Sequence, residues 1–163
     1  VHTMIRLAFL ALLFSFIVTT NADDKVDDTS VYSVHPIGHV EKYNGKTAVV
    51  LDQQYLPGLL RLEDFSHVWV IWWFDQNDTP EMREILQVHP RRDSRNPLSG
   101  VFATRAPVRP NLIGLSLCRI MAVNENIVEI DGIDAFDGTT VLDLKPYIPS
   151  MESIPAAKTP KRL

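Results

Sequence analysis

The sequence has 163 residues, of which 45% are hydrophobic and 22% are charged, and its formal net charge is −4. This length is enough for one domain with one modest core, and the composition excludes a chain that is disordered throughout. The negative charge excludes a global attraction to nucleic acid, so a nucleic-acid partner would need a local basic patch. The single cysteine, Cys118, excludes an internal disulfide and a cysteine-rich zinc site, and its apolar neighbours predict that it is buried. We predict no metal site.

Residues 1–22 have the pattern of a secretory signal peptide. Arg6 precedes an apolar run over residues 7–18, and small residues follow at the positions that a signal peptidase reads. A run of about twelve residues makes roughly 18 Å of helix, which is shorter than the ~30 Å hydrocarbon core, so no stable membrane span is expected. We predict export to the periplasm or the medium, with an acidic linker over residues 23–30. The alternatives are an uncleaved anchor, and a cytoplasmic protein if the signal is not used.

Short β patterns begin near residue 31. The first strands are expected over residues 34–43 and 47–51, and residues 55–65 have room for one irregular helical turn. Residues 67–74 form a continuous apolar, aromatic and β-branched run. Such a run predicts a strand that is buried on both of its faces.

The second half continues the β pattern after one short helix. The segment Asp78-Thr79-Pro80-Glu81 is typical of a helix N-cap followed by proline at the first helical position. A short strand, a hairpin and a last strand are then expected, over residues 101–104, 115–123 with 127–130, and 139–144. Many short strands with few helices predict an all-β domain over residues 31–149, either a barrel or a sandwich. Residues 150–163, which are rich in proline and basic residues, are expected to form a flexible tail.

The segment from residue 89 to residue 114 is rich in arginine and proline. Between Arg83 and Arg119 the sequence has seven arginines and only two acids, Glu84 and Asp93. Arginine forks match the oxygens of phosphates and carboxylates, so this segment predicts a site for an anionic ligand. Its four prolines fix φ and reduce the entropy that is lost on binding. The alternative is a solvated loop with surface ion pairs.

Two aspartates within residues 132–140 are further candidates. Asp134 follows an apolar strand and precedes Ala135 and Phe136, so its carboxylate could bind a ribose hydroxyl or a ligand amino group. Asp137 precedes Gly138 in a turn dipeptide, and aspartates commonly stabilise such turns through the backbone. Asp137 is therefore either a ligand contact or a turn residue.

Five motifs follow one another along the chain: His89-Pro90-Arg91, Gly100-Val101-Phe102-Ala103-Thr104-Arg105, Arg109-Pro110-Asn111, Asp134-Ala135-Phe136-Asp137-Gly138-Thr139 and Lys145-Pro146-Tyr147. Together they resemble the signature of the TsaA/TrmO family, and the resemblance covers roughly residues 34–149. The family usually has a serine before the second arginine and a proline after the asparagine, where this chain has Ala106 and Leu112.

The resemblance implies a small β-barrel with one or two short helical insertions that forms a homodimer. It implies S-adenosylmethionine as the methyl donor, bound outside any Rossmann fold. The implied acceptor is N6 of threonylcarbamoyladenosine in tRNA, next to the anticodon.

The resemblance also assigns candidate roles to individual residues. Cofactor contacts are expected from Phe102, Ala103, Thr104, Arg105, Asp134, Asp137 and Thr139. Substrate contacts are expected from Arg91, Arg109, Asn111 and Lys145. The catalytic residue is left open, with four candidates: His89, Asn111, Lys145 and Tyr147.

Two other functions stay open at this point. One is an exported module that binds S-adenosylmethionine or another anion without transferring methyl groups, which the predicted signal favours. The other is a methyltransferase for a small molecule, which the net charge of −4 favours because tRNA is a polyanion.

Overall fold

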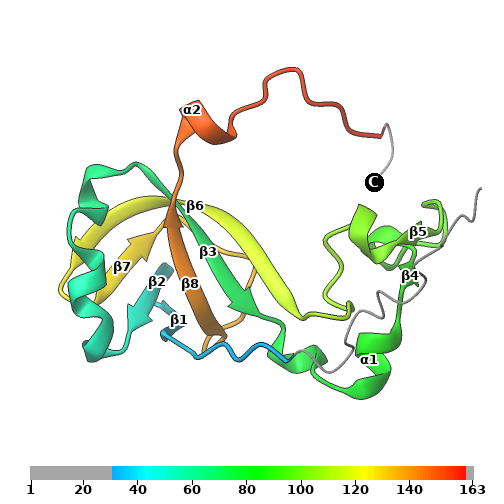
Figure 1. Cartoon of the computed structure of the whole chain (residues 1–163), viewed down its shortest axis with the longest axis horizontal. Coiled ribbons are helices and arrows are strands. Elements are labelled where there is room, and N and C mark those ends of the chain that lie inside the picture. The colour runs from blue at the N-terminus through cyan, green and yellow to red at the C-terminus, as the bar shows by residue number, and fades with distance from the viewer. Residues whose placement is uncertain (1–30, 161–163) are drawn as a thin grey trace, which may run out of the picture. The chain divides into compact units, whose positions relative to one another are not determined.

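Six strands close into an antiparallel barrel. The computed structural model describes residues 31–160 (Figure 1), so the predicted signal peptide (1–22) and linker (23–30) lie outside the described residues. The strands pair in the closed order β1-β2-β7-β6-β3-β8. Their bounds are β1 (Gly38–Tyr43), β2 (Lys46–Leu51), β3 (His67–Trp73), β6 (Ile113–Asn124), β7 (Ile127–Ile130) and β8 (Thr140–Pro146). This confirms the all-β barrel and excludes the sandwich.

Alternate side chains of the strands fill the interior of the barrel. Most of the fully buried ones are valines: Val40, Val49, Val68, Val70, Val128 and Val141. Valine suits these positions because it is stiff at χ1 and packs well on a pleated surface. Cys118 on β6 is buried with them, as its apolar neighbours predicted.

Strand β3 is buried on one face only, so the prediction of burial on both faces is wrong. Its inward residues are buried, and the residues between them are half-buried on the outer face. The indole N–H groups of the outer tryptophans donate hydrogen bonds to acidic side chains. The apolar pattern of residues 67–74 does not indicate these bonds. Trp69 Nε1 donates to both carboxylate oxygens of Glu152, at 3.1 and 3.0 Å, and Trp73 Nε1 donates to Asp78 at 3.1 Å.

Glu152 belongs to α2 (Pro149–Glu152), at the start of the segment that was expected to be a flexible tail. Its carboxylate also accepts a hydrogen bond from the backbone N–H of Ile148, at 3.1 Å. The first residues after 149 are therefore attached to the outer face of the barrel through Trp69. None of the helices within residues 31–160 is long and apolar enough to cross a membrane.

Two local predictions have opposite outcomes. The hairpin of β6 and β7 forms around residues 124–126, with Glu125 in a left-handed conformation (φ 51°). The strand predicted over residues 101–104 is wrong, because residues Val101–Ala103 form a 3₁₀ turn, η5. Val101 N donates to Leu86 O at 2.9 Å and Thr104 N donates to Val101 O at 3.2 Å, so the backbone closes a turn there.

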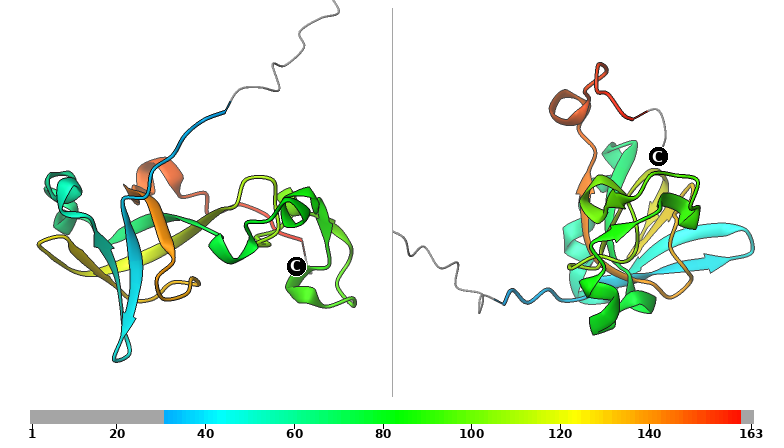
Figure 2. Two further views of the ribbon diagram at one scale, coloured as in Figure 1. Left: turned by 90° about the horizontal axis from the view of Figure 1, so that it is seen from below. Right: turned by 90° about the vertical axis from the view of Figure 1, so that its right-hand side faces the viewer.

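Residues 74–112 join β3 to β6 and carry most of the remaining short elements. Figures 1 and 2 show this segment, drawn in green, beyond the ends of β3 and β6. It contains η3 (Asp75–Asn77), α1 (Pro80–Glu84), β4 (Gln87–Val88), η4 (Pro90–Arg92), β5 (Ser99–Gly100) and η5. The earlier irregular turn over residues 55–65 is confirmed as η1 (Gln53–Leu59) and η2 (Leu62–Asp64).

The helix start predicted within residues 78–81 is confirmed, with Thr79 as the N-cap of α1 directly before Pro80. Thr79 Oγ1 accepts a hydrogen bond from Met82 N at 3.3 Å, while the Asp78 carboxylate turns to Trp73 and Arg83. Leu112, which stands where the family usually has proline, is fully buried at the end of this connection. Phe74 N donates to Leu112 O at 2.8 Å, so the beginning and the end of the connection are joined.

The burial of Cys118 gives a direct test of the barrel. Burial raises the pKa of its thiol to about 11, so at pH 8 only about one thiol in a thousand is ionised. We expect the native protein to resist thiol-specific reagents and to react with one equivalent after unfolding in urea. Rapid labelling of the folded protein would contradict the packing of β6.

Candidate functional site

Two adjoining cavities lie where residues 74–112 meet the end of the barrel. The first cavity, of about 740 Å³, is lined mainly by the end of β3, the start of β6 and residues 134–139. The second cavity, of about 950 Å³, is lined mainly by residues 88–92 and 102–108. Both volumes are in the range of small-ligand sites. Five residues line both cavities and form their shared wall: Arg92, Thr104, Arg105, Pro107 and Asp134.

Aromatic side chains form one side of the first cavity. The rings of Trp72 and Phe74 meet edge to face, with 4.4 Å between their centroids. Trp72 Nε1 donates to Ser116 Oγ at 3.1 Å, which fixes the indole. Gly114 lies against that indole, and a side chain there would collide with the ring, so the close approach requires glycine. The two rings therefore give the first cavity an apolar surface.

A hydrogen-bonded turn forms one side of the second cavity. His89 Nδ1 donates to the backbone oxygen of Asn96 at 2.7 Å, and Asn96 Nδ2 donates to Pro90 O at 2.9 Å. Because Nδ1 carries the proton of this hydrogen bond, Nε2 of a neutral His89 is free to accept one. His89 also lines the second cavity, so it is a candidate proton acceptor.

The arginines of this region divide into two groups. Arg83 and Arg95 form ion pairs with Asp78 and Asp93, at 2.8 and 2.7 Å, and line neither cavity. Within residues 31–160, four arginines that line the cavities form no ion pair: Arg91, Arg92, Arg105 and Arg109. Neighbouring positive charges without acids attract an anion. This distribution favours an anionic-ligand site over a solvated loop with surface ion pairs.

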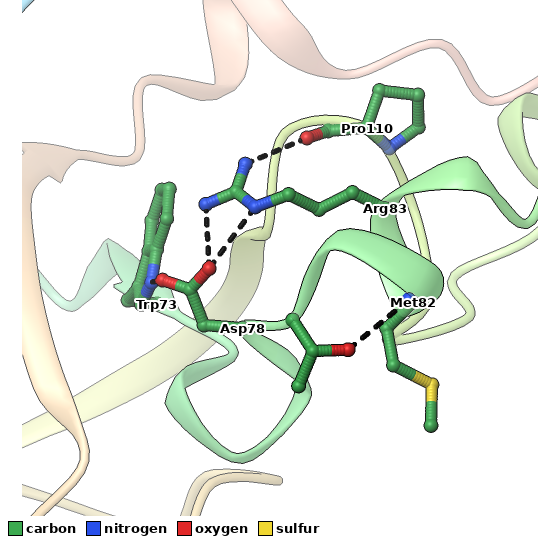
Figure 3. Close-up of polar contacts among 6 residues, drawn as sticks. Trp73, Asp78, Met82, Arg83 and Pro110 are labelled. Carbon is green, nitrogen blue, oxygen red and sulfur yellow. Dashed lines mark hydrogen bonds and ion pairs between the residues drawn. The ribbon is translucent and has the colours of Figure 1, made fainter.

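Arg83 connects α1, the end of β3 and the proline-rich loop (Figure 3). Its Nε and Nη2 donate to Asp78 Oδ1 at 3.0 and 2.8 Å, and its Nη1 donates to Pro110 O at 2.9 Å. The guanidinium also lies 5.3 Å from the centre of the Trp73 ring. We call these four residues, Trp73, Asp78, Arg83 and Pro110, the arginine bracket. The hydrogen bond from Trp73 and those from Arg83 hold the pKa of Asp78 below its usual value.

Most of the predicted cofactor residues line a cavity. Thr104, Arg105 and Asp134 belong to the shared wall, Phe102 and Ala103 line only the second cavity, and Thr139 lines only the first. Asp137 lines neither. Its Oδ1 accepts the backbone N–H of Lys42 on β1 at 2.7 Å, so its side chain joins residues 134–139 to the barrel and does not bond to the backbone of its own turn.

The predicted substrate and catalytic residues are spread more widely. Arg91 and His89 line the second cavity, and Arg109 lines the first, whereas Asn111 lines neither. Lys145 pairs with Asp143 at 2.7 Å, and Tyr147 packs edge to face on Trp69. Lys145 lies opposite Trp69 and Tyr147 bonds to His67, positions that are roughly 10 Å and roughly 17 Å along β3 from Trp72, and neither residue lines a cavity. The structure therefore does not bring Lys145 and Tyr147 to the other candidates of the same chain.

Four residues that line the first cavity, and Arg83 beside it, were not identified from the sequence. Trp72 and Phe74 belong to an apolar run whose pattern does not indicate where the barrel ends. Asp75 follows that run without any motif. Arg92 stands next to Arg91, so the paired arginines were a usable signal. Arg83 is outside the motifs, and only its contacts reveal its role.

Comparison with known proteins identifies the family of this arrangement. Residues 34–153 match the model of the tRNA-methyltransferase O N-terminal domain. The chain belongs to this family. A probable S-adenosyl-L-methionine-binding protein of Methanocaldococcus jannaschii is 43% identical over 115 residues, which are 71% of this chain and 91% of that protein.

Longer family members match over part of their length. The tRNA (adenine(37)-N6)-methyltransferase of Escherichia coli is 37% identical over 124 residues, covering 74% of this chain and 52% of that enzyme. The crystal structure of TrmO from P. aeruginosa is 29% identical with a TM-score of 0.64, covering 83% of this chain and 63% of that one. The chain therefore spans most of the archaeal family member but little more than half of the bacterial enzyme.

The arginine bracket predicts a pH-dependent contribution to stability. Because the pKa of Asp78 is lower in the folded state, its carboxylate stabilises the fold above its unfolded pKa, and this stabilisation is lost as the pH falls through the lower, folded pKa. We expect Asp78→Asn to lower the urea midpoint at pH 7, and the difference from wild type to shrink below pH 3.8.

Asp93→Asn is the matched control. Its pKa is also lowered, by Arg95, but that partner is two residues away and ties no second segment to the barrel. It should change the midpoint less than Asp78→Asn does. Equal midpoints for wild type and Asp78→Asn at pH 7 would contradict the role of the bracket.

Proposed function

We propose that this chain is an S-adenosylmethionine-dependent methyltransferase that acts on N6 of adenine 37 in tRNA. The observation that carries the proposal is the gathering of four unpaired arginines and Asp134 around two adjoining cavities. Family membership supports the reaction type, since relatives are named as tRNA (adenine(37)-N6)-methyltransferases and as probable S-adenosylmethionine-binding proteins.

The first cavity has side chains that fit S-adenosylmethionine. Arg105 and Arg109 would hold its carboxylate, and Asp134 would accept hydrogen bonds from its ammonium or ribose groups. The Trp72 and Phe74 rings offer an apolar surface for the adenine. When bound, the cofactor supplies a methyl group on a positively charged sulfur.

The chain's own contribution is to align donor and acceptor and to take up a proton. Holding two reactants near attack distance supplies a large part of the rate gain in such transfers. Residues of the shared wall contact both cavities and are suited to this alignment. His89 is the proposed acceptor of the proton that N6 loses, because its Nδ1–H is bound to the Asn96 carbonyl and Nε2 is free.

We further propose threonylcarbamoyladenosine as the acceptor rather than unmodified adenosine. The donor has one carboxylate, which one or two arginines can satisfy. Four arginines that form no ion pair outnumber the two acids of the cavities, Asp75 and Asp134, and this leaves positive charge for a second anionic group such as the threonyl carboxylate of the modified base. The family resemblance of the five sequence motifs supports the same acceptor.

A methyltransferase for a small acceptor is the second candidate. Two observations favour it: the net charge of −4, and the match over 91% of an archaeal relative that is named only for S-adenosylmethionine binding. The effect of salt separates the candidates, because tRNA binding weakens steeply with added salt and binding of a small acceptor does not.

We also keep export and homodimer formation as proposals. Cell fractionation tests the export of the protein, and light scattering tests its oligomeric state.

Binding of the donor is the first test of the proposal. We expect calorimetric titration with S-adenosylmethionine to give a single site, and Arg105→Met and Asp134→Asn each to weaken it by about 10-fold to 150-fold, the loss of one charged hydrogen bond. Arg95→Met is the matched control, since Arg95 lines neither cavity, and it should bind like wild type. A folded wild-type protein that does not bind the donor would overturn the proposal.

Methyl transfer to defined tRNA tests the acceptor. We expect transfer of the labelled methyl group to tRNA that carries threonylcarbamoyladenosine at position 37 and none to the same tRNA with plain adenosine. Equal transfer to both would assign unmodified adenine as the acceptor. Binding of the donor without transfer to either tRNA would favour the non-catalytic binding module.

A further inference from the structure

We propose that the second cavity is the compartment for the acceptor nucleotide of an RNA strand. The target base would stack on Phe102, and the neighbouring phosphates would contact Arg91 and Arg92. The inference rests on the proposed methyltransferase function. It assigns Phe102 to the acceptor, whereas the family resemblance assigned it to the cofactor.

Two exposed phenylalanines divide between the two cavities. Phe102 is 80% exposed and lines only the second cavity, while Phe136 is 64% exposed and lines only the first. A large aromatic side chain with so much surface in water contributes little to the core. Proteins that recognise single-stranded RNA stack unpaired bases on such rings. Each cavity therefore has its own aromatic platform, and Phe102 is the more open one.

The charged residues of the two cavities also favour RNA in the second cavity and the donor in the first. The first cavity has two acids, Asp75 and Asp134, beside its arginines, which suits a donor with a sulfonium and an ammonium group. The second cavity has three arginines and Asp134 as its one acid among the described residues. An RNA strand is a polyanion, so the acid-poor cavity is the more favourable place for it.

Arg91 and Arg92 are held in an unusual backbone conformation. Both are left-handed, with φ of 59° and 55°, which is costly for residues with a side chain. The turn is fixed by Arg92 N donating to His89 O at 3.1 Å and by the hydrogen bonds that join His89, Asn96 and Pro90. A strained turn that its surroundings hold in place is typical of ligand-binding segments. Here it sets two arginines that form no ion pair at the second cavity.

The shared wall makes the two compartments suitable for one reaction. Arg105 and Asp134 line both cavities, so a base in the second cavity and a donor in the first would meet across them. Transfer needs the reacting atoms close together, which separate sites on the surface could not provide. The proposal therefore explains why two cavities, and not one, adjoin at this end of the barrel.

Matched phenylalanine variants test the proposal. In the full chain we expect Phe102→Leu to raise the KM for an anticodon stem-loop with threonylcarbamoyladenosine by about 5-fold to 150-fold, as expected for the loss of one stacked base. Its KM for S-adenosylmethionine should stay within about 2-fold of wild type. Phe136→Leu should raise the KM for S-adenosylmethionine and leave the KM for the stem-loop close to that of wild type. Phe102→Trp should restore the RNA KM, which a loss of folding would not allow.

Salt dependence tests the contacts with phosphate. Direct binding of the same fluorescein-labelled stem-loop, measured by anisotropy without S-adenosylmethionine, should weaken in Arg91→Met and in Arg92→Met. Each variant should lower the slope of log Kd against log salt by about 0.7, the value for one phosphate contact on a single strand.

The possible outcomes separate this inference from the proposed function. If Phe102→Leu raises the KM for S-adenosylmethionine and leaves that for RNA unchanged, the compartment assignment is overturned while the methyltransferase function stands. If the stem-loop binds through Phe102 and the arginines but no methyl group is transferred, the assignment stands and the proposed function fails. RNA binding that no second-cavity variant changes would overturn the assignment.

Discussion

The geometry of the site depends on one ion pair, between Asp78 and Arg83. Asp78 also accepts a hydrogen bond from Trp73, the last residue of β3, and Arg83 also donates to the carbonyl of Pro110. The pair therefore fixes the proline-rich loop relative to the barrel wall. Pro110 directly follows Arg109, so the position of an arginine that lines the first cavity follows from the position of this carbonyl. The loop's other attachments are the buried Leu112 and Arg105 Nη1, which donates to Leu115 O at 3.3 Å.

The ion pairs of the region also decide which arginines can bind a ligand. Asp78 and Asp93 each pair with one arginine that lines neither cavity. These two acids are therefore not available to pair with the arginines that do line the cavities. The arginines left over are those of the cavities. A chain with a net charge of −4 can in this way present a local positive site. Our proposal rests on the same sorting, since it assigns the donor to the acid-bearing first cavity and the RNA to the acid-poor second cavity.

The sequence predicts the barrel well and the cavities only in part. Alternating valines and the turn at residues 124–126 are local signals, and they identified the strands that carry the core. The strand expected at 101–104 failed because its apolar residues serve a turn that Leu86, fifteen residues earlier, stabilises. Motif spacing found Arg105 and Asp134, which lie 29 residues apart yet share one wall. Trp72, Phe74 and Arg83 were not predicted as site residues. Their roles depend on where β3 ends in the folded barrel, and no local sequence pattern indicates that position.

The central claim is that the donor occupies the first cavity and leaves the second free for the acceptor. A crystal structure of the chain with S-adenosylhomocysteine, the product of the donor, tests this most directly. The account predicts that the ligand contacts Arg105 and Asp134, lies against Trp72 or Phe136, and leaves Phe102 exposed to solvent. A ligand that is stacked on Phe102 between Arg91 and Arg92 would contradict it, because the cavity assigned to the acceptor would then belong to the donor.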